Sequence, residues 1–267
     1  MNALVSDAES TLRLLVFLGV LLVLALLEWR FPRRPLHYSR PRRWFTNFGI
    51  SFLNTAIVRV LLPIVGVGAA LLAAERGWGL FNVLAVSAWL SIPLFLLVFD
   101  LTIYFQHRLF HLIPVLWRLH RMHHTDPDYD VSTGNRFHPL SILLSSLIKL
   151  ALTVILGPPA VAVVIAEVLL NATSMFNHSN VYLPLWLDRR LRLLIVTPDM
   201  HRVHHSIDSL EHNRNFGFNF PWWDRLFGTY QDQPQLGHEA MQIGIAGFED
   251  DRSVKLTSLL VQPLQKN

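Results

Sequence analysis

Histidines are the residues whose spacing in this chain most clearly predicts chemistry. The sequence holds 13 of them, and eight fall into three tight groups. On a helix, residues three and four positions apart share a face, so the rings of one group point the same way. Neutral imidazole is the commonest metal ligand, and each group therefore predicts part of a metal site. The groups are His107 and His111; His120, His123 and His124; and His201, His204 and His205.

The number of these histidines, and the residue types found with them, favour a site with two metal ions. Ten histidines lie between His107 and His205, and one ion of four- to six-fold coordination cannot use them all. The chain has no cysteine, which excludes thiolate zinc sites and iron–sulfur clusters. The glutamate of an H-E-x-x-H metalloprotease is missing, as is the Glu-x-x-His pattern of soluble di-iron bundles. A nitrogen-rich dinuclear site remains.

The composition predicts that this site belongs to an integral membrane protein. Hydrophobic residues make up 52% of the 267 positions and charged residues only 16%, against about 25% charged in ordinary soluble domains. Mean hydropathy is +0.35. This composition excludes a disordered chain, and the lack of cysteine excludes a disulfide scaffold. The net charge of +4 fits Lys and Arg in loops beside membrane spans, and we expect no nucleic-acid partner.

Five apolar segments are expected to position the histidines. We interpret three as single spans, the first a retained anchor, and the last two as a hairpin that turns at Gly157-Pro158. The arginine-rich loops 30–43 and 107–138 are then cytoplasmic by the positive-inside rule. The predicted fold is an all-α membrane bundle with a cytoplasmic helical cap that holds a histidine-rich dimetal site. The segments are 12–29, 47–74, 86–106, 139–156 and 159–176.

Polar residues on the spans could orient the metal-binding rings. Asp100 and Tyr104 continue the stripe of His107 and His111, and a similar stripe ends at His178. Polar stripes on membrane helices face the protein interior, and groups there can fix an imidazole by hydrogen bonding. The candidates are Asp100, Tyr104, Glu167 and Asn171, together with Asp199 beside the third group.

The pattern indicates one membrane-embedded domain over 1–231, with its histidine core at about 90–231. The remaining residues, 232–267, are polar apart from one apolar stretch. They are expected to form an amphipathic surface helix or a loose end.

At these residues the sequence resembles the fatty acid hydroxylase/sterol desaturase superfamily. The signature of that family is an HxxxH or HxxxxH box followed by two HxxHH boxes. The resemblance covers about residues 90–231, and three further runs are similar to its bacterial sterol desaturase-like branch. These runs are HHTDPDYDVSTGNRFHP at 123–139, TPDMHRVHHS at 197–206 and WDRLFGTY at 223–230.

The resemblance implies an O2-dependent oxidoreductase that hydroxylates or desaturates a C–H bond of a membrane lipid, such as a sterol or fatty acyl chain. It implies two iron ions, for which zinc can substitute on purification, and the eight box histidines as ligands. His178 and His138 would complete the ligand set. The chain departs from the fatty acid 2-hydroxylase branch at Ser174, where that branch has a histidine.

The resemblance also bears on partners and location. With neither a cysteine-ligated cluster nor a dinucleotide-binding motif in the chain, a separate reductase, ferredoxin or cytochrome is expected to deliver electrons. The expected location is a bacterial inner membrane with the boxes on the cytoplasmic side. Two alternatives stay open at this point: a hydrolase that uses metal-bound hydroxide, and a non-enzymatic metal-binding membrane protein.

Overall fold

The computed structural model describes residues 2–248 and 250–265, with side chains from residue 9 onward, and within these residues the chain is helical. The described residues contain two isolated β-bridges, Pro32 with Val181 and Ser206 with Ile243, and no longer strand. The predicted all-α class is confirmed.

Four helices are long and apolar enough to cross a membrane, with mean hydropathies between 1.6 and 2.5. The last two form the predicted hairpin. Its turn depends on Gly157, which has a φ of +62° and sits so close to the Trp78 carbonyl that a Cβ would lie 2.4 Å from that oxygen. The four are α1 (Asn2–Arg30), α5 (Ala88–Leu112), α7 (Pro139–Leu156) and α8 (Ala160–Asn177).

The prediction of one apolar span over 47–74 is wrong. That stretch is divided between α2 (Arg40–Leu61) and α3 (Val67–Arg76). Pro63 and Gly66, the latter with a φ of +56°, fall in the break. In addition, α2 buries polar side chains such as Arg43 and Asn47, which pack on the protein and not on lipid.

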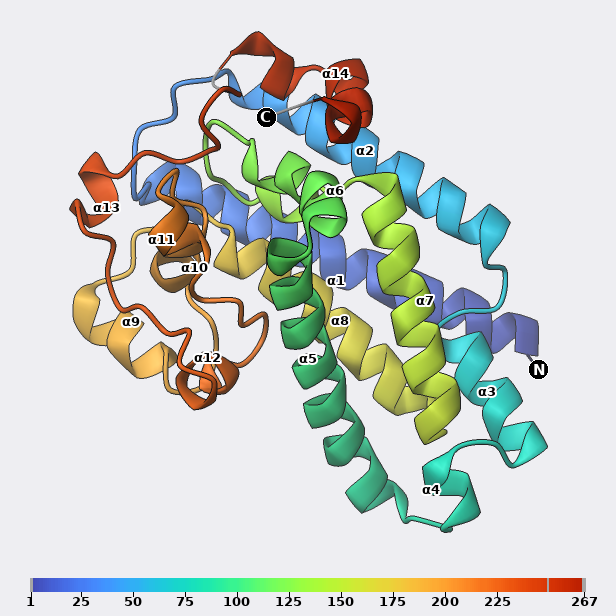
Figure 1. Ribbon diagram of the computed structural model, residues 1–267. Helices are drawn as coiled ribbons and strands as arrows, with labels where there is room; N and C mark the ends of the chain where they lie inside the picture. Colours follow the sequence, from blue (N-terminus) through green and yellow to red (C-terminus); the bar gives the residue numbers. More distant parts are fainter. Residues whose placement is uncertain (1, 249, 266–267) are drawn as a thin grey trace.

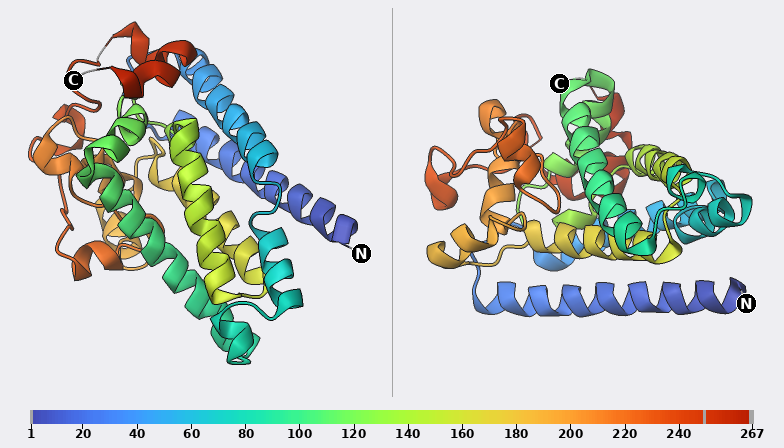
Figure 2. Two further views of the ribbon diagram at one scale, coloured as in Figure 1. Left: turned by 45° about the vertical axis from the view of Figure 1, so that its right-hand side comes forward. Right: turned by 90° about the horizontal axis from the view of Figure 1, so that it is seen from below.

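The membrane helices pack around an apolar core between α3, α5 and α8, where Phe95, Phe99 and Ala162 are buried. Helix α1 lies along α8 at the margin of the bundle, and only 6% of its apolar window is buried (Figure 2). An ion pair of 2.5 Å between Arg13 and Glu167 fastens α1 to α8.

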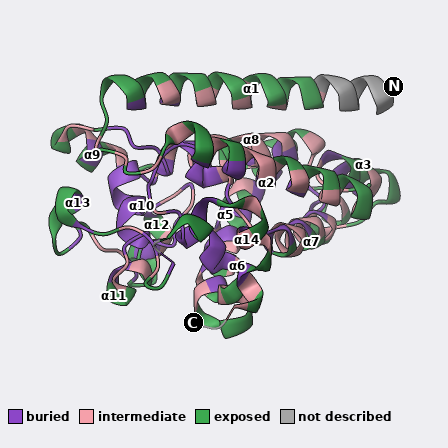
Figure 3. Cartoon of the chain, turned by 90° about the horizontal axis from the view of Figure 1, so that it is seen from above, coloured by how far each residue is buried: buried purple, intermediate pink, exposed green. Residues whose placement is uncertain are grey.

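Short helices gather around the C-terminal end of α5 and form the predicted cap, whereas α4 (Leu80–Val83) lies at the opposite end (Figure 1). Most of the buried residues lie in and around this cap, whereas α1 is largely exposed (Figure 3). The cap comprises α6 (Pro114–His124), η1 (Thr133–Asn135), α9 (Leu185–Leu191), α10 (Pro198–His204), α11 (Ser209–His212), α12 (Trp222–Leu226), α13 (Gly237–Ala240), η2 (Asp251–Val254), α14 (Leu256–Val261) and η3 (Gln262–Leu264).

Candidate metal centre

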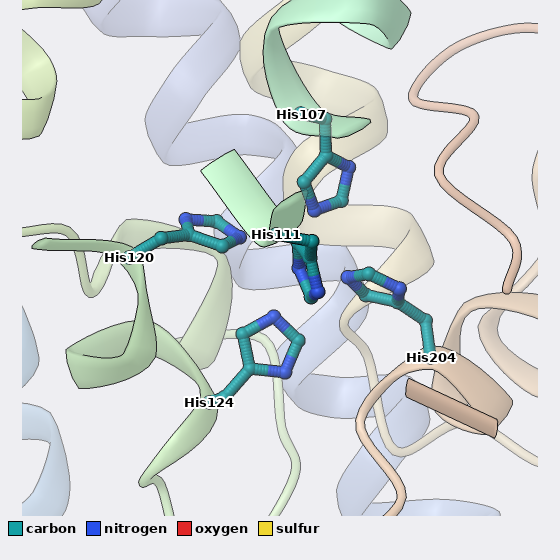
Figure 4. A group of neighbouring side chains, drawn as sticks. All are labelled: His107, His111, His120, His124 and His204. Carbon is teal, nitrogen blue, oxygen red and sulfur yellow. The ribbon is translucent and has the colours of Figure 1, made fainter. Parts of the chain in front are cut away.

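The cap and the adjoining ends of α5 and α8 bring nine of the ten candidate histidines into two groups. In each group the nitrogens that face the centre lie within 4.8 Å of one another. Figure 4 shows five imidazoles of one group directed at a common centre. We call them site 1, which consists of His107, His111, His120, His124 and His204, and site 2, which consists of His123, His178, His201 and His205.

Each HxxHH box supplies both sites. In α6, His120 and His124 face site 1 while His123 faces site 2. In α10 the division is reversed, because His201 and His205 face site 2 and His204 faces site 1. Residues four apart on a helix differ by only about 40° in direction, so the first and last histidines of a box face the same site, while the middle histidine faces the other site. The spacing alone suggested that all rings of a box are directed at one point, and this prediction is wrong.

Backbone carbonyls hold four of the rings in place. A carbonyl only accepts hydrogen bonds, so the facing Nδ1 carries the proton and Nε2 keeps a free lone pair. This arrangement, in which the far nitrogen of a ligand ring is hydrogen-bonded, is typical of metal-binding histidines. The pairs are His107 with Phe216 (2.9 Å), His204 with Arg214 (2.7 Å), His178 with Ser174 (2.7 Å) and His123 with Arg136 (3.2 Å).

The donor set fits metal ions. The Nε2 atoms of His107, His120 and His204 are buried without a hydrogen-bond partner, and so are both ring nitrogens of His111, His124 and His205. Leaving such atoms unpaired inside a protein is costly. An ion at the centre of each group would bind one nitrogen of each of these rings.

Electrostatics keep these rings neutral and able to bind a cation. Burial lowers the pKa of His178 to about 3. Burial, followed by the neighbouring imidazoles, lowers the pKa well below its ordinary value in six further histidines of the two sites. These are His120, His123, His124, His201, His204 and His205.

His138 is the candidate ligand that the structure leaves outside both sites. Its Nδ1 accepts a hydrogen bond from the amide of Leu140 and so caps α7. Its Nε2 faces the carbonyl of Leu260 at 3.1 Å. Both nitrogens are engaged, so we do not include His138 among the proposed ligands. His212 also lies outside the sites and stacks on Trp117, with ring centroids 5.4 Å apart.

Two of the polar candidates contact the chain around α12. Asp100 accepts hydrogen bonds from the amides of Asn219 and Phe220 and from the indole of Trp223, and so holds the chain beside α12. Tyr104 contacts the hydroxyl of Thr229 at 2.8 Å.

A chain of hydrogen bonds connects the hydroxyl of Thr229 to a ring of site 1. Thr229 donates to Asp224, which also accepts from the amide of Phe216, and the Phe216 carbonyl faces His107. Burial raises the pKa of Asp224 to about 6. This chain of contacts ties the end of α5 to α12.

The other polar candidates have no described contact with the histidines of site 1 or site 2. Glu167 pairs with Arg13 instead, and Asn171 is exposed on α8. Asp199 pairs with Arg202 and with Arg33.

A buried charged network behind His123 was not expected from the sequence. Arg43 donates to Asp126 at 2.8 Å and to Asp130 at 2.6 Å, and none of the three side chains is exposed. Next to them, Arg136 donates to the carbonyl of Met122 within the second box. The clustered aspartates between His124 and Arg136 were the available signal, but their partner on α2 is distant in sequence.

Comparison with known proteins connects these residues to lipid-modifying enzymes. A family model described as fatty acid hydroxylase matches residues 92–229, more than half of the chain and all nine grouped histidines. No solved structure gives a significant match.

Three similar proteins carry names of lipid enzymes. Ornithine lipid hydroxylase OlsE of Rhizobium tropici is 28% identical over 87% of this chain and 70% of its own length. Human alkylglycerol monooxygenase is 32% identical over 58% of this chain and 34% of its own length. Delta(7)-sterol 5(6)-desaturase ERG3A of Gibberella zeae is 30% identical over 64% and 45%, respectively. The chain thus spans less than half of the latter two proteins.

Proposed function

Because this chain belongs to the fatty acid hydroxylase family, we propose that it is an O2-dependent di-iron enzyme that hydroxylates or desaturates a C–H bond of a membrane lipid. One observation carries the proposal. Nine histidines from four separate segments form two groups at the end of a bundle of membrane-span candidates. Their inward nitrogens are buried lone pairs of the kind that a metal ion would satisfy.

The donor set favours a redox-active ion. Imidazole suits iron as well as zinc, and the chemistry that bound iron supplies is the activation of O2 needed to attack an unactivated C–H bond. Zinc fits the same nitrogens without that chemistry, so zinc in a purified sample does not contradict the proposal. Metal-bound hydroxide would suit hydrolysis, but the similar proteins are named for hydroxylation, monooxygenation and desaturation.

The residues of the chain itself orient the ligands and exclude water. The carbonyls of Phe216, Arg214, Ser174 and Arg136 fix four rings. The ring of Phe137 stacks on His123 with centroids 4.4 Å apart. A dry, apolar surround is what a reaction on a hydrocarbon chain requires, because water would compete for the reactive centre.

The position of the sites indicates the substrate class. His107 and His111 occupy the last turns of a membrane-span candidate, and His178 directly follows another. A substrate that reaches these helix ends from the side is a lipid. We propose a sterol, a fatty acyl chain or a related membrane lipid, in keeping with the lipid names of the relatives.

We further propose that a separate protein supplies the electrons and that the sites face the cytoplasm of a bacterial cell. The arginine-rich segment 30–43 supports that orientation. Purified protein with NAD(P)H alone is then expected to show no multiple turnover. Sustained turnover under those conditions would contradict a separate donor.

The proposed function is tested by comparing the lipids of cells with and without the gene under 16O2 and 18O2. A product that gains one labelled oxygen indicates hydroxylation, and a loss of two hydrogens indicates desaturation. His204→Ala in site 1 and His123→Ala in site 2 should each abolish the change, at equal protein abundance. A lipid change that persists without O2, or in both variants, contradicts the proposal.

A further inference from the structure

The last part of the chain lies across the helix that carries the second histidine box. We call residues 254–265 the C-terminal strap; they comprise the end of η2 with α14 and η3. In Figure 1 α14 lies beside α2 and near α6. Leu259 of the strap is fully buried in a cluster with Ile50 of α2 and Met122 of α6. Met122 is a residue of the box His120–His124, so the strap packs on the box itself.

Arg121, inside the same box, holds the strap with its guanidinium. Its Nη2 donates to the carbonyl of Gln262 at 2.7 Å and to that of Gln265 at 2.6 Å. The residue is only 1% exposed, and its guanidinium lies 5.1 Å from the ring centre of Phe248. A charged donor forms a stronger hydrogen bond to a carbonyl than a neutral donor does. Arg118, one turn earlier in α6, also donates to the carbonyl of Gln265, at 3.3 Å.

Two further contacts fix the strap to the surrounding elements. The side-chain amide of Gln262 donates to the hydroxyl of Thr125, the residue directly after the box, at 3.0 Å. The hydroxyl of Thr46 on α2 donates to the carbonyl of Val254 at 2.9 Å. The strap therefore bridges α2 to both the middle and the end of the box helix.

We propose that the C-terminal strap positions the second histidine box through Arg121, so that metal binding at both sites depends on a segment that supplies no ligand. The inference rests on the proposed metal centre. Helix α6 presents His120 and His124 to site 1 and His123 to site 2. Rotation or displacement of this one helix therefore moves nitrogens of both sites. Arg121 is a positioning residue, because its side chain touches the strap and not the ligand nitrogens.

The test uses the full-length protein in detergent, titrated with Co2+ and followed by its visible d–d absorption. Arg121→Gln should weaken Co2+ binding roughly 10- to 100-fold, the range found when groups that support metal ligands are removed, and should alter the spectrum of the bound ion. Arg121→Lys keeps a charged donor and should recover most of the affinity. The matched control is Arg189→Gln, an exposed arginine on α9.

A second control separates positioning from general stability. Val163→Ala removes volume from the apolar core between the membrane helices and should lower the thermal midpoint while the Co2+ spectrum stays unchanged. An Arg121→Gln protein that binds Co2+ with wild-type affinity and spectrum would overturn the role of the strap. So would an equal spectral change in Val163→Ala. A wild-type chain that binds no Co2+ contradicts the metal centre itself, and that outcome is distinguishable from the other two.

Discussion

The Nε2 atoms of His123 and His178 lie 3.0 Å apart, although 55 positions separate the two residues in sequence. The Nδ1 atom of each ring faces a backbone carbonyl. Each Nε2 atom therefore presents a lone pair, and two lone pairs cannot hydrogen-bond to each other. The close approach is explained if a cation binds between the rings and their neighbours. This relationship joins the box helix α6 to the end of α8 in site 2.

The first prediction concerns His178. His178→Ala removes one of the four nitrogens of site 2. We expect lipid modification to be abolished and the metal content to fall, with site 1 still occupied. Elemental analysis of the purified variant, together with lipid mass spectrometry, checks both expectations.

His138→Ala is the matched control, because His138 lies outside both sites. It should keep the full metal content and the lipid product. It should lose about 0.5–2 kcal/mol of stability through the missing cap of α7. Loss of metal in His138→Ala, or full metal content in His178→Ala, would show that the site residues are wrongly assigned.

The second prediction concerns pH. Burial keeps the cap histidines neutral, with the pKa of His178 lowered to about 3, whereas the same residues in the unfolded chain take up protons below about pH 6.5. The metal-free protein should therefore lose stability as the pH falls below about 6.5, by up to about 1.4 kcal/mol per pH unit for each such histidine. Thermal unfolding between pH 8 and pH 5 measures this loss.

Bound metal provides the comparison. An ion that binds the folded form stabilises it by mass action, so the metal-loaded protein should keep a higher thermal midpoint at every pH above the point of metal release. Equal pH dependence with and without metal would contradict the assignment of the buried histidines as ligands.

The third prediction concerns the buried network behind His123. Arg43→Ala leaves Asp126 and Asp130 without their cation in a site that has no exposed side-chain surface. The expected loss is about 3–5 kcal/mol, because an unpaired buried charge is strongly destabilising. Thermal or denaturant unfolding of the detergent-solubilised protein measures it.

The neighbouring residue supplies the control. Arg42 pairs with Asp251 at the surface, where an ion pair contributes at most about 1 kcal/mol. Arg42→Ala should therefore be nearly neutral. Similar effects of the two substitutions would mean that the buried network does not stabilise the second box.

The fourth prediction concerns Asp224. Its carboxylate accepts from the amides of Phe216 and Gly217 at 2.8 and 2.7 Å, and the Phe216 carbonyl orients His107. Asp224→Ala should weaken metal binding at site 1 by about tenfold or more, by loss of support for a ligand ring. Glu239→Ala, on an exposed side chain of the cap, should leave metal affinity unchanged, and the reverse order of effects would exclude this role for Asp224.

The sequence predicted which histidines gather, because the spacing within each box is local. It did not predict how the boxes divide between two sites, which depends on how α6 and α10 face each other. His138 could not be separated from the ligands, since one of its partners, Leu260, lies 122 positions away. The span expected over 47–74 failed because the chain breaks around Pro63 and Gly66, between α2 and α3. The burial of Arg43 near the start of α2 depends on Asp126 and Asp130, which are distant in sequence.

The groups that orient the rings could not be predicted from the sequence either. The polar side chains on the spans were the natural candidates, yet the rings with a resolved Nδ1 contact use backbone carbonyls such as those of Phe216 and Ser174. Every residue has a backbone carbonyl, so the sequence does not mark the carbonyls that orient the rings. Asp100 was found by its place on the α5 stripe, but it supports a loop and not a ring.

The most direct test of the account is the ratio of metal to protein in the full-length chain, produced with ample iron and purified without air. Two groups of converging histidines predict two transition-metal ions per chain. Substituting one ligand from each site, as in the double variant His123→Ala and His204→Ala, should remove both. A wild-type protein that is folded and free of transition metal, or a double variant that keeps both ions, would contradict the assignment of two metal sites.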